Sequence, residues 1–239
     1  VAFRRGLLRI DLAAGEAILS VTAELTTQQN ESLRLHSNGF RGSRRTTSYG
    51  LGVSVTARDN DDRRPEDHHW VATRHAEDLP PPATVGTEAA RRALGRRGSR
   101  KAESGRTCLL VENRAASQLL SALLDPLTGS SLQQRRSCFT DRRGESIAAP
   151  TLTLRDDPFL PRGLGSRLYD DDALAARPRP LISAGRLDDY LVDVYYGRKL
   201  GRAPSCGSTS NLLLLPGELT PEALIGAAGD GFLVQSFLG

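Results

Sequence analysis

The sequence of 239 residues contains no methionine, only two lysines and only four histidines. It also has no apolar run long enough for a transmembrane helix, and its first ten residues lack the apolar stretch and small-residue cleavage site of a secretory signal. We therefore predict a cytoplasmic protein with no membrane partner. Because the chain begins with Val1 and has no methionine, we expect it to be part of a longer protein.

Cysteine is also scarce. Cys108, Cys138 and Cys206 lie far apart and form no CxxC pair. This spacing predicts neither a zinc knuckle nor a disulfide framework, and it fits a reducing cytosol.

The excess of positive charge is small. Residues 1–106 hold 18 basic and 13 acidic groups, and residues 107–239 hold 14 and 15. We do not predict a nucleic-acid partner from this balance. The Arg-rich segment from Arg91 to Lys101 leaves DNA binding as an alternative hypothesis. Arginines on an outer helix face are, however, usually solvated.

The first part of the chain has the alternation typical of antiparallel strands. Residues 16–26 and 31–36 alternate apolar and polar side chains. Asn38-Gly39 then predicts a tight hairpin in which both turn residues have positive φ. In residues 46–57, one predicted face consists of Thr47, Tyr49, Leu51, Val53 and Val55, and the other of Ser48, Gly50, Gly52, Ser54 and Thr56. The second face would meet solvent, another backbone or an extended peptide.

A helix is predicted over residues 84–97, followed by a linker over 98–105. Its inward positions are Val85, Ala89, Ala93 and Leu94, and its surface positions are Arg91, Arg92, Arg96 and Arg97. We place a domain boundary in the linker, which divides the chain into domains 1–104 and 105–239.

The second domain mixes short strands with helices. We predict buried strands over 107–111 and 211–215, a helix over 112–129 interrupted at Pro126, and a hairpin over 181–196 that turns at Ala184-Gly185. A last helix should begin after the N-cap Thr220 and run towards Gly229. The fold class is therefore α+β, with mostly antiparallel sheets, a few packed helices and two domains.

A metal site can be imagined near the histidines. If residues 66–78 form a strand, His69 and His75 face the same side, next to His68, Glu66 and Asp67. Such a site would make the chain a stand-alone metallopeptidase. However, the sequence contains neither HExxH nor HExxxH, the spacings that place two imidazoles and a carboxylate around zinc on one helix face.

Five carboxylates cluster around a Pro- and Gly-rich stretch, LTLRDDPFLPRGLGSRLYDDD at 152–172. Asp156, Asp157, Asp170, Asp171 and Asp172 offer oxygen ligands for a hard cation. Asp-Pro followed by further Pro and Gly is equally typical of turns in which Asp side chains cap backbone amides. We favour the structural interpretation and keep the cation site as the alternative.

These residues also carry a family resemblance. The segments TLTLRDDPFLPRGLGSRLYDDDA, LISAGRLDDYLVDVYYGRKLGRAPSCGS, SNLLLLPGELTPEALI and GDGFLV resemble the C-terminal domain of the TldD/PmbA family, also called modulators of DNA gyrase. HSNGF, TTSYGLGVSV and VGTEAARRAL are similar to its central domain. The resemblance covers residues 20–239, and it implies that a preceding domain and the final strands are missing.

The resemblance implies a metalloprotease built from two related subunits. One, TldD, carries zinc on an HExxxH helix; the equivalent helix here, ENRAASQLLSALLDPLTG, has no histidine. The chain is therefore similar to the PmbA partner, also called TldE, with no catalytic residue and no cofactor of its own. The resemblance implies a heterodimer with a TldD-like zinc-bearing subunit around a chamber that takes up unfolded peptides as added β-strands. A DNA gyrase modulator is the alternative that the family's second name suggests.

The resemblance also implies a motif for peptide docking or for structure. Its candidate residues are Asp156, Asp157, Pro158, Gly163, Gly165, Ser166, Asp170, Asp171, Asp172, Arg198 and Gly207. One departure concerns Ala173, which stands where the family has glycine. If this position needs positive φ, alanine costs about 1 kcal/mol.

Overall fold

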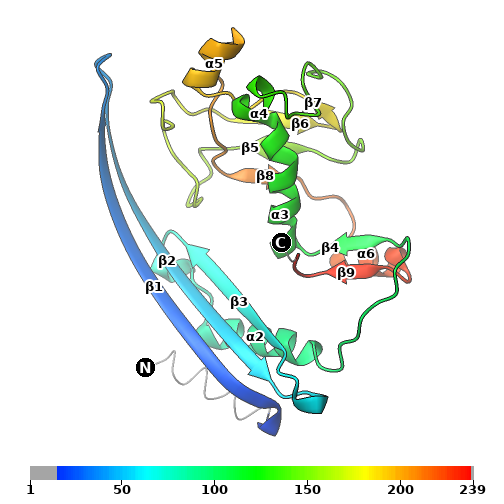
Figure 1. The fold of residues 1–239 in the computed structure, drawn as a ribbon. Helices are drawn as coiled ribbons and strands as arrows, with labels where there is room; N and C mark the ends of the chain where they lie inside the picture. Colours follow the sequence, from blue (N-terminus) through cyan, green and yellow to red (C-terminus); the bar gives the residue numbers. More distant parts are fainter. Residues whose placement is uncertain (1–14, 238–239) are drawn as a thin grey trace. The chain divides into compact units, whose positions relative to one another are not determined.

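The computed structural model describes residues 15–237 and divides into two compact units (Figure 1). The first unit reaches to Glu103 and includes the short segment Arg162–Leu164; the second holds the remainder from Ser104 onward. The first ten residues, where we predict no secretory signal, lie outside the described residues. None of the described helices is long and apolar enough to cross a membrane.

The first unit is a three-stranded antiparallel sheet with a helix on one face (Figure 1). The strands are β1 (Ile18–Leu35), β2 (Arg41–Ala57) and β3 (Glu66–Thr73), in the order β1-β2-β3, and the helix is α2 (Pro82–Gly95). Short 3-10 turns lie at Gly15–Ala17, Asn60–Asp62 and Ala76–Asp78. The two alternating segments predicted at 16–26 and 31–36 are one continuous strand.

The core of the first unit lies between β2 and α2. Leu51, Val53 and Val55 are at most 2% exposed, and they pack on Val85 and its helical neighbours. This confirms the predicted apolar faces of the strand and of the helix. One surface prediction was wrong: Arg92 is buried, and its guanidinium pairs with Glu88. A long arginine side chain can bury its stem while its charged head group finds a carboxylate.

The hairpin between β1 and β2 turns where predicted, with a different geometry. Only Gly39 has positive φ, at 90°. The side chain of Asn38 instead accepts a hydrogen bond from the N–H of Phe40 at 3.1 Å, and the N–H of His36 donates to Phe40 O at 3.0 Å. The turn is therefore a three-residue loop closed by a side chain, because Asn caps backbone amides as readily as it adopts positive φ.

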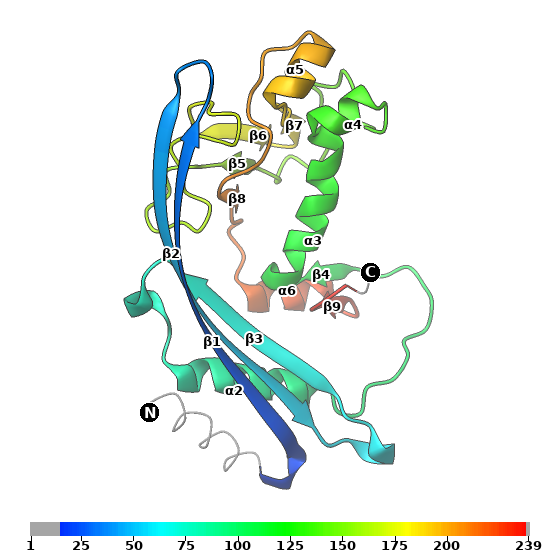
Figure 2. The same cartoon turned by 60° about the vertical axis from the view of Figure 1, so that its left-hand side comes forward.

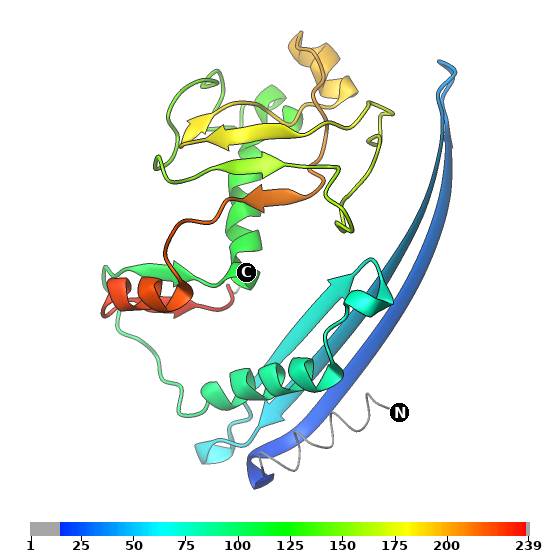
Figure 3. The same ribbon diagram turned by 180° about the vertical axis from the view of Figure 1, so that it is seen from behind.

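The second unit has a four-stranded antiparallel sheet flanked by helices (Figure 3). Its strands are β5 (Leu154–Asp156), β6 (Arg179–Ser183), β7 (Arg186–Leu187) and β8 (Leu212–Leu214), in the order β7-β6-β5-β8. The helices are α3 (Asn113–Leu124), α4 (Gly129–Gln133) and α5 (Val194–Leu200), with a 3-10 turn at Asp125–Leu127 that holds Pro126. Leu120, Leu123 and Leu124 of α3 pack on the buried sheet residues. Ala184 and Gly185 both have positive φ, which confirms the predicted turn. The predicted extent of the hairpin was wrong, because β7 ends at Leu187 and α5 begins at Val194, after the N-cap Asp193.

The second unit ends in a smaller substructure. Strands β4 (Leu109–Val111) and β9 (Phe232–Val234) form a two-stranded parallel sheet next to α6 (Pro221–Ala228), which begins after the predicted N-cap Thr220. Two predictions of burial were wrong here, since Leu109 of β4 is 57% exposed and Leu214 of β8 is 47% exposed. An apolar run predicts a strand, but burial also requires elements on both faces.

Candidate functional site

The loops at one end of the β5-β6 pair meet around a buried ion pair. Asp156 and Arg179 are directly opposed across the two strands, and their side chains are only 3% and 6% exposed. Nε and Nη2 of Arg179 both lie 3.3 Å from Oδ2 of Asp156. Oδ1 of Asp156 accepts hydrogen bonds from the N–H and the hydroxyl of Ser210, at 2.6 and 2.7 Å. Asp156 therefore joins three segments of the unit.

The neighbouring Asp157 begins a turn held by Asn211. Oδ1 of Asp157 accepts from the N–H of Phe159 at 2.9 Å, which is an Asx turn at the Asp-Pro pair. Asn211 donates to Asp157 O at 2.7 Å and accepts from the N–H of Gly165 at 2.8 Å. A Cβ atom on Gly165 would collide with the carbonyl of Ser210. This glycine is therefore needed for the close approach of two backbones, and it has no positive φ.

A second turn is built on Asp170. Its Oδ1 accepts hydrogen bonds from the N–H groups of Asp172 and Leu174, at 3.0 and 2.9 Å. The Oδ2 of Asp172 in turn accepts from the N–H of Val194 at the start of α5. These carboxylates bind backbone donors, and among residues 15–237 no group of three His, Cys, Asp or Glu side chains is placed to hold a metal ion.

The remaining candidates contribute unequally. Pro158 is buried in the same loops, and Ser166 accepts a hydrogen bond from Asn211 at 2.9 Å. The backbone of Gly207 lies against Asp193, where a Cβ would come within 2.8 Å of the aspartate side chain. Arg198 is exposed in the last turn of α5, Asp171 is exposed, and Gly163 belongs to the segment grouped with the first unit.

Two arginines central to these loops were not predicted from the sequence. Arg179 is the first residue of β6, and only its register opposite Asp156 reveals its role. Arg167 donates to the carbonyl of Ser208 at 2.7 Å and contacts the thiol of Cys206 at 3.4 Å. The loops therefore form a rigid frame in which charged side chains position the backbone.

Ala173 occupies a strained position in this frame. Its φ is +64°, in the left-handed region that favours glycine. Replacing Ala173 with glycine should raise the free energy of unfolding of the second unit by about 1 kcal/mol, as measured by urea titration. Ala175→Gly is the matched control, since Ala175 has no positive φ and the change should destabilise by about 0.5–1 kcal/mol. An Ala173→Gly variant no more stable than the parent would contradict the strain argument.

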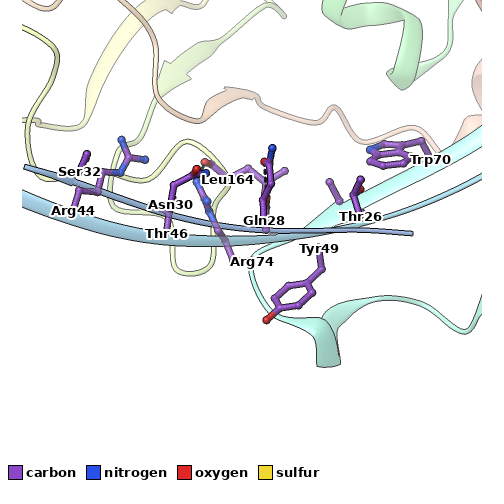
Figure 4. Close-up of a pocket in the computed structure, with 13 residues that line it drawn as sticks. Thr26, Gln28, Asn30, Ser32, Arg44, Thr46, Tyr49, Trp70, Arg74 and Leu164 are labelled. Atoms are coloured by element: carbon purple, nitrogen blue, oxygen red, sulfur yellow. Dashed lines mark hydrogen bonds between the residues drawn. The ribbon is translucent and has the colours of Figure 1, made fainter. Parts of the chain in front are cut away.

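On the polar face of the first unit, a tryptophan side chain packs directly on two glycines of the neighbouring strand. A Cβ atom at Gly50 or Gly52 would collide with the indole of Trp70, so the ring lies directly over both glycines. A shallow groove continues along the same face and is lined by Thr26, Gln28, Asn30, Ser32, Thr46 and Ser48. Figure 4 shows Trp70, Gln28 and Asn30 on one side of the strands and Tyr49 on the other. The small-residue face thus bears an indole that is 45% exposed, which the strand pattern did not reveal.

The histidines do not lie on one strand, which the predicted shared face required. Strand β3 ends at Thr73, so His75 lies beyond it, at the start of a 3-10 turn. His68 is next to Asp67, and its Nδ1 lies 3.9 Å from the carboxylate. His69 pairs with Val53 of β2. The prediction required one strand through His75, and the chain turns before reaching it.

Three of the six basic residues in the Arg-rich segment form ion pairs inside the first unit. Arg91 and Arg92 both pair with Glu88, at 2.7 Å. Nε of Arg96 lies 2.9 Å from Oδ2 of Asp67, a carboxylate that is only 2% exposed. These ion pairs offset the charge that suggested a nucleic-acid surface.

Helix α3 lies where the family resemblance implies the metal-binding helix of the zinc-bearing subunit. The polar side chains of the helix are those of Asn113, Arg114, Ser117, Gln118 and Ser121. Zinc sites in proteins use thiolate, imidazole and carboxylate ligands. The residues of this helix therefore do not fit a zinc ion.

Two family models match the chain. The PmbA/TldA metallopeptidase central domain matches residues 6–97, and the PmbA/TldA metallopeptidase C-terminal domain matches residues 104–239. The chain is 27% identical to metalloprotease PmbA of Escherichia coli O157:H7, over 96% of the chain and 54% of that protein. It is also 27% identical to a metalloprotease PmbA homolog of Buchnera aphidicola, over 82% and 44%. The chain thus spans about half the length of the curated relatives it matches.

Solved structures agree with these matches. A modulator of DNA gyrase from Bacteroides thetaiotaomicron has a TM-score of 0.93 and 31% identity, over 99% of the chain and 54% of that protein. TldE from Thermococcus kodakarensis has a TM-score of 0.83 at 20% identity, over 98% and 55%, which shows a common fold. The comparisons confirm the resemblance and the α+β fold class.

Proposed function

The chain belongs to the PmbA/TldD metallopeptidase family, and from this premise we propose that it is a non-catalytic subunit of a zinc metalloprotease that processes unfolded peptides. Its partner would be a TldD-like subunit that holds the zinc. The absence of any imidazole from α3 is the observation that carries this proposal. When bound in the partner, zinc would supply the polarised water for peptide-bond hydrolysis.

The role proposed for this chain is to hold peptide next to that partner. Among residues 15–237, strand β3 lies at the edge of its sheet and pairs only with β2, so an extended peptide could add a strand there. Main-chain hydrogen bonds of this kind do not depend on the peptide sequence. The polar face beside Trp70 offers hydroxyl and amide groups for further contacts. The loop frame around Asp156 would keep the wall of the chamber rigid.

We place this activity in the cytoplasm. The described structure contains three unpaired thiols, Cys108, Cys138 and Cys206, which a reducing compartment would preserve.

The proposal is tested by producing the chain with an HExxxH-bearing family subunit of the same organism. The two should co-purify, and elemental analysis should find about one zinc per pair and none in the isolated chain. Unfolded casein should be cleaved by the pair, and cleavage should stop when the partner's first motif histidine becomes alanine.

The matched variant here is the triple change His68→Ala, His69→Ala, His75→Ala. It should leave zinc content and cleavage by the pair unchanged. Stoichiometric zinc in the isolated chain that disappears in this variant would instead establish an atypical metallopeptidase site in the chain.

A further inference from the structure

The hairpin of β1 and β2 extends beyond the rest of its sheet (Figure 2). Strand β3 ends at Thr73, which pairs with Tyr49, so residues 28–48 form a ribbon of two strands, here called the arm. In the described part of the chain no third strand pairs with the arm. Eight residues of β1 lie between Gln28 and Leu35, which corresponds to about 27 Å. A ribbon of two strands has little stability of its own.

The tip and base of the arm are nonetheless well connected. At the tip, the rings of His36 and Phe40 lie 5.5 Å apart, and the N–H of Gly39 donates to His36 O at 3.1 Å. At the base, Arg74 donates to the carbonyl of Thr47 at 2.9 Å, and the hydroxyl of Thr47 donates to Arg74 O at 2.7 Å. An arm ordered before it meets a partner loses less conformational entropy on binding.

One face of the arm exposes two leucines. Leu33 and Leu35 are two residues apart on β1, so they share a face, and they are 59% and 63% exposed. Their cross-strand neighbours, Ser43 and Arg41, are polar and do not cover them. Two adjacent leucines on a projecting ribbon expose apolar surface that a partner would bury.

The arm is also positively charged. Residues 28–48 contain Arg34, Arg41, Arg44 and Arg45 and a single acid, Glu31, which gives 4 − 1 = +3. Glu31 lies 3.2 Å from Arg45. Complementarity to this local excess of positive charge requires an acidic partner surface.

We propose that the arm docks on an acidic surface of the zinc-bearing subunit, with Leu33 and Leu35 buried in an apolar pocket and Arg41 and Arg45 at its rim. The identity of the partner rests on the proposed function. In protein interfaces, buried apolar residues supply most of the affinity, and charges at the rim set orientation and association rate. The leucines would have the first role and the arginines the second.

A protein surface fits the arm better than duplex nucleic acid. Ribbon arms that kink DNA insert apolar side chains between base steps. Here the leucines lie on one face of the ribbon, and the loop at its tip consists of Ser37, Asn38 and Gly39. The apolar surface is therefore set back from the tip, where a pocket in a folded partner can enclose it.

The test measures the affinity of the full chain for the HExxxH-bearing subunit by calorimetry at several salt concentrations. Leu33→Ser/Leu35→Ser and Arg41→Glu/Arg45→Glu should each weaken binding about tenfold or more. Affinity of the parent chain should fall as salt rises, and the charge-reversed variant should show a smaller salt dependence.

Two controls match these changes. Leu25→Ser removes a leucine that is 61% exposed on the same strand but outside the arm. Arg100→Glu/Lys101→Glu makes the same charge change at exposed residues elsewhere. Both should alter affinity by less than about twofold. Circular dichroism and thermal unfolding establish that all variants fold.

The outcomes separate the two proposals. If the parent chain does not bind the subunit, the proposed function fails and the arm proposal fails with it. If the parent binds and the arm variants bind equally well, only the arm proposal fails. If Arg41→Glu/Arg45→Glu abolishes binding to a 20-base-pair DNA duplex while affinity for the subunit is unchanged, the arm is a nucleic-acid element and the proposal is overturned.

Discussion

Replacing Asp156 with asparagine is expected to lower the free energy of unfolding of the second unit by about 3–5 kcal/mol. The carboxylate is 3% exposed and compensates Arg179, which is 6% exposed. Asparagine keeps the size of the side chain but removes its charge. The guanidinium would then be buried without its counter-charge, beside an amide whose N–H groups repel it.

The measurement can assign the loss to one unit. Trp70 is the single tryptophan and lies in the first unit, whereas four of the five tyrosines, Tyr169, Tyr190, Tyr195 and Tyr196, lie in the second. Urea unfolding of Asp156→Asn should therefore shift the tyrosine transition to lower urea and leave the Trp70 transition unchanged.

A double variant keeps this prediction testable if Asp156→Asn fails to fold. Asp156→Asn/Arg179→Met removes both charges and should recover much of the lost stability, since an apolar replacement of a buried ion pair is often nearly neutral. A different result would identify Asp156 as a cation ligand. Magnesium or calcium would then raise the melting temperature of the parent protein, and Asp156→Asn would abolish that increase.

Replacing Glu88 with glutamine is expected to destabilise the first unit by about 2 kcal/mol at pH 7. Hydrogen bonds from Arg91, with the charges of Arg91 and Arg92, lower the pKa of the Glu88 carboxyl from 4.5 to about 2. Arg91 is 63% exposed and contributes little to stability, because solvent screens it. Arg92 is only 6% exposed, so loss of its carboxylate partner accounts for most of the effect.

The same pKa shift predicts a dependence on pH. The folded state holds the carboxylate more strongly than the unfolded state does, so this stabilisation is present above about pH 4.5 and is lost as the pH falls towards 2. The parent and Glu88→Gln should therefore differ at pH 7 and converge near pH 2. Trp70 fluorescence during urea unfolding at each pH gives the measurement.

Glu24→Gln is the control for this series. Glu24 is exposed on the polar face of β1, so its replacement should leave the Trp70 transition within about 0.5 kcal/mol of the parent at every pH. A constant difference between parent and Glu88→Gln from pH 7 to pH 2 would show that the destabilisation does not come from the carboxylate charge.

Much of the fold could be predicted because its signals are local. The period-two pattern of residues 46–57 placed Leu51, Val53 and Val55 on a buried face, and helical spacing placed Val85 opposite them. Thr220 and Pro221 marked the start of α6. Each of these signals concerns residues within one element or its caps, where sequence spacing corresponds directly to spatial neighbourhood.

The errors arose where several elements meet. The pattern of α2 placed Arg92 on the surface, but a long arginine stem can lie along a core while its head group finds a carboxylate. Leu109 was predicted to be buried because its neighbours are apolar, yet in the described structure β4 forms a sheet with β9 alone, and Leu109 is 57% exposed. Exposure depends on what packs on an element, and an element's own residues do not contain that information.

The sequence by itself determined two things about this protein: an α+β chain rich in antiparallel hairpins, and a helix after Val111 without the imidazoles of an HExxxH motif. Both depend on residue type and short spacing. Only the tertiary structure decided that Asp156 pairs with Arg179, that Trp70 lies over two glycines and that the arm projects beyond β3. The physical reason is that these features follow from strand register and from where neighbouring strands end, which join residues distant in sequence.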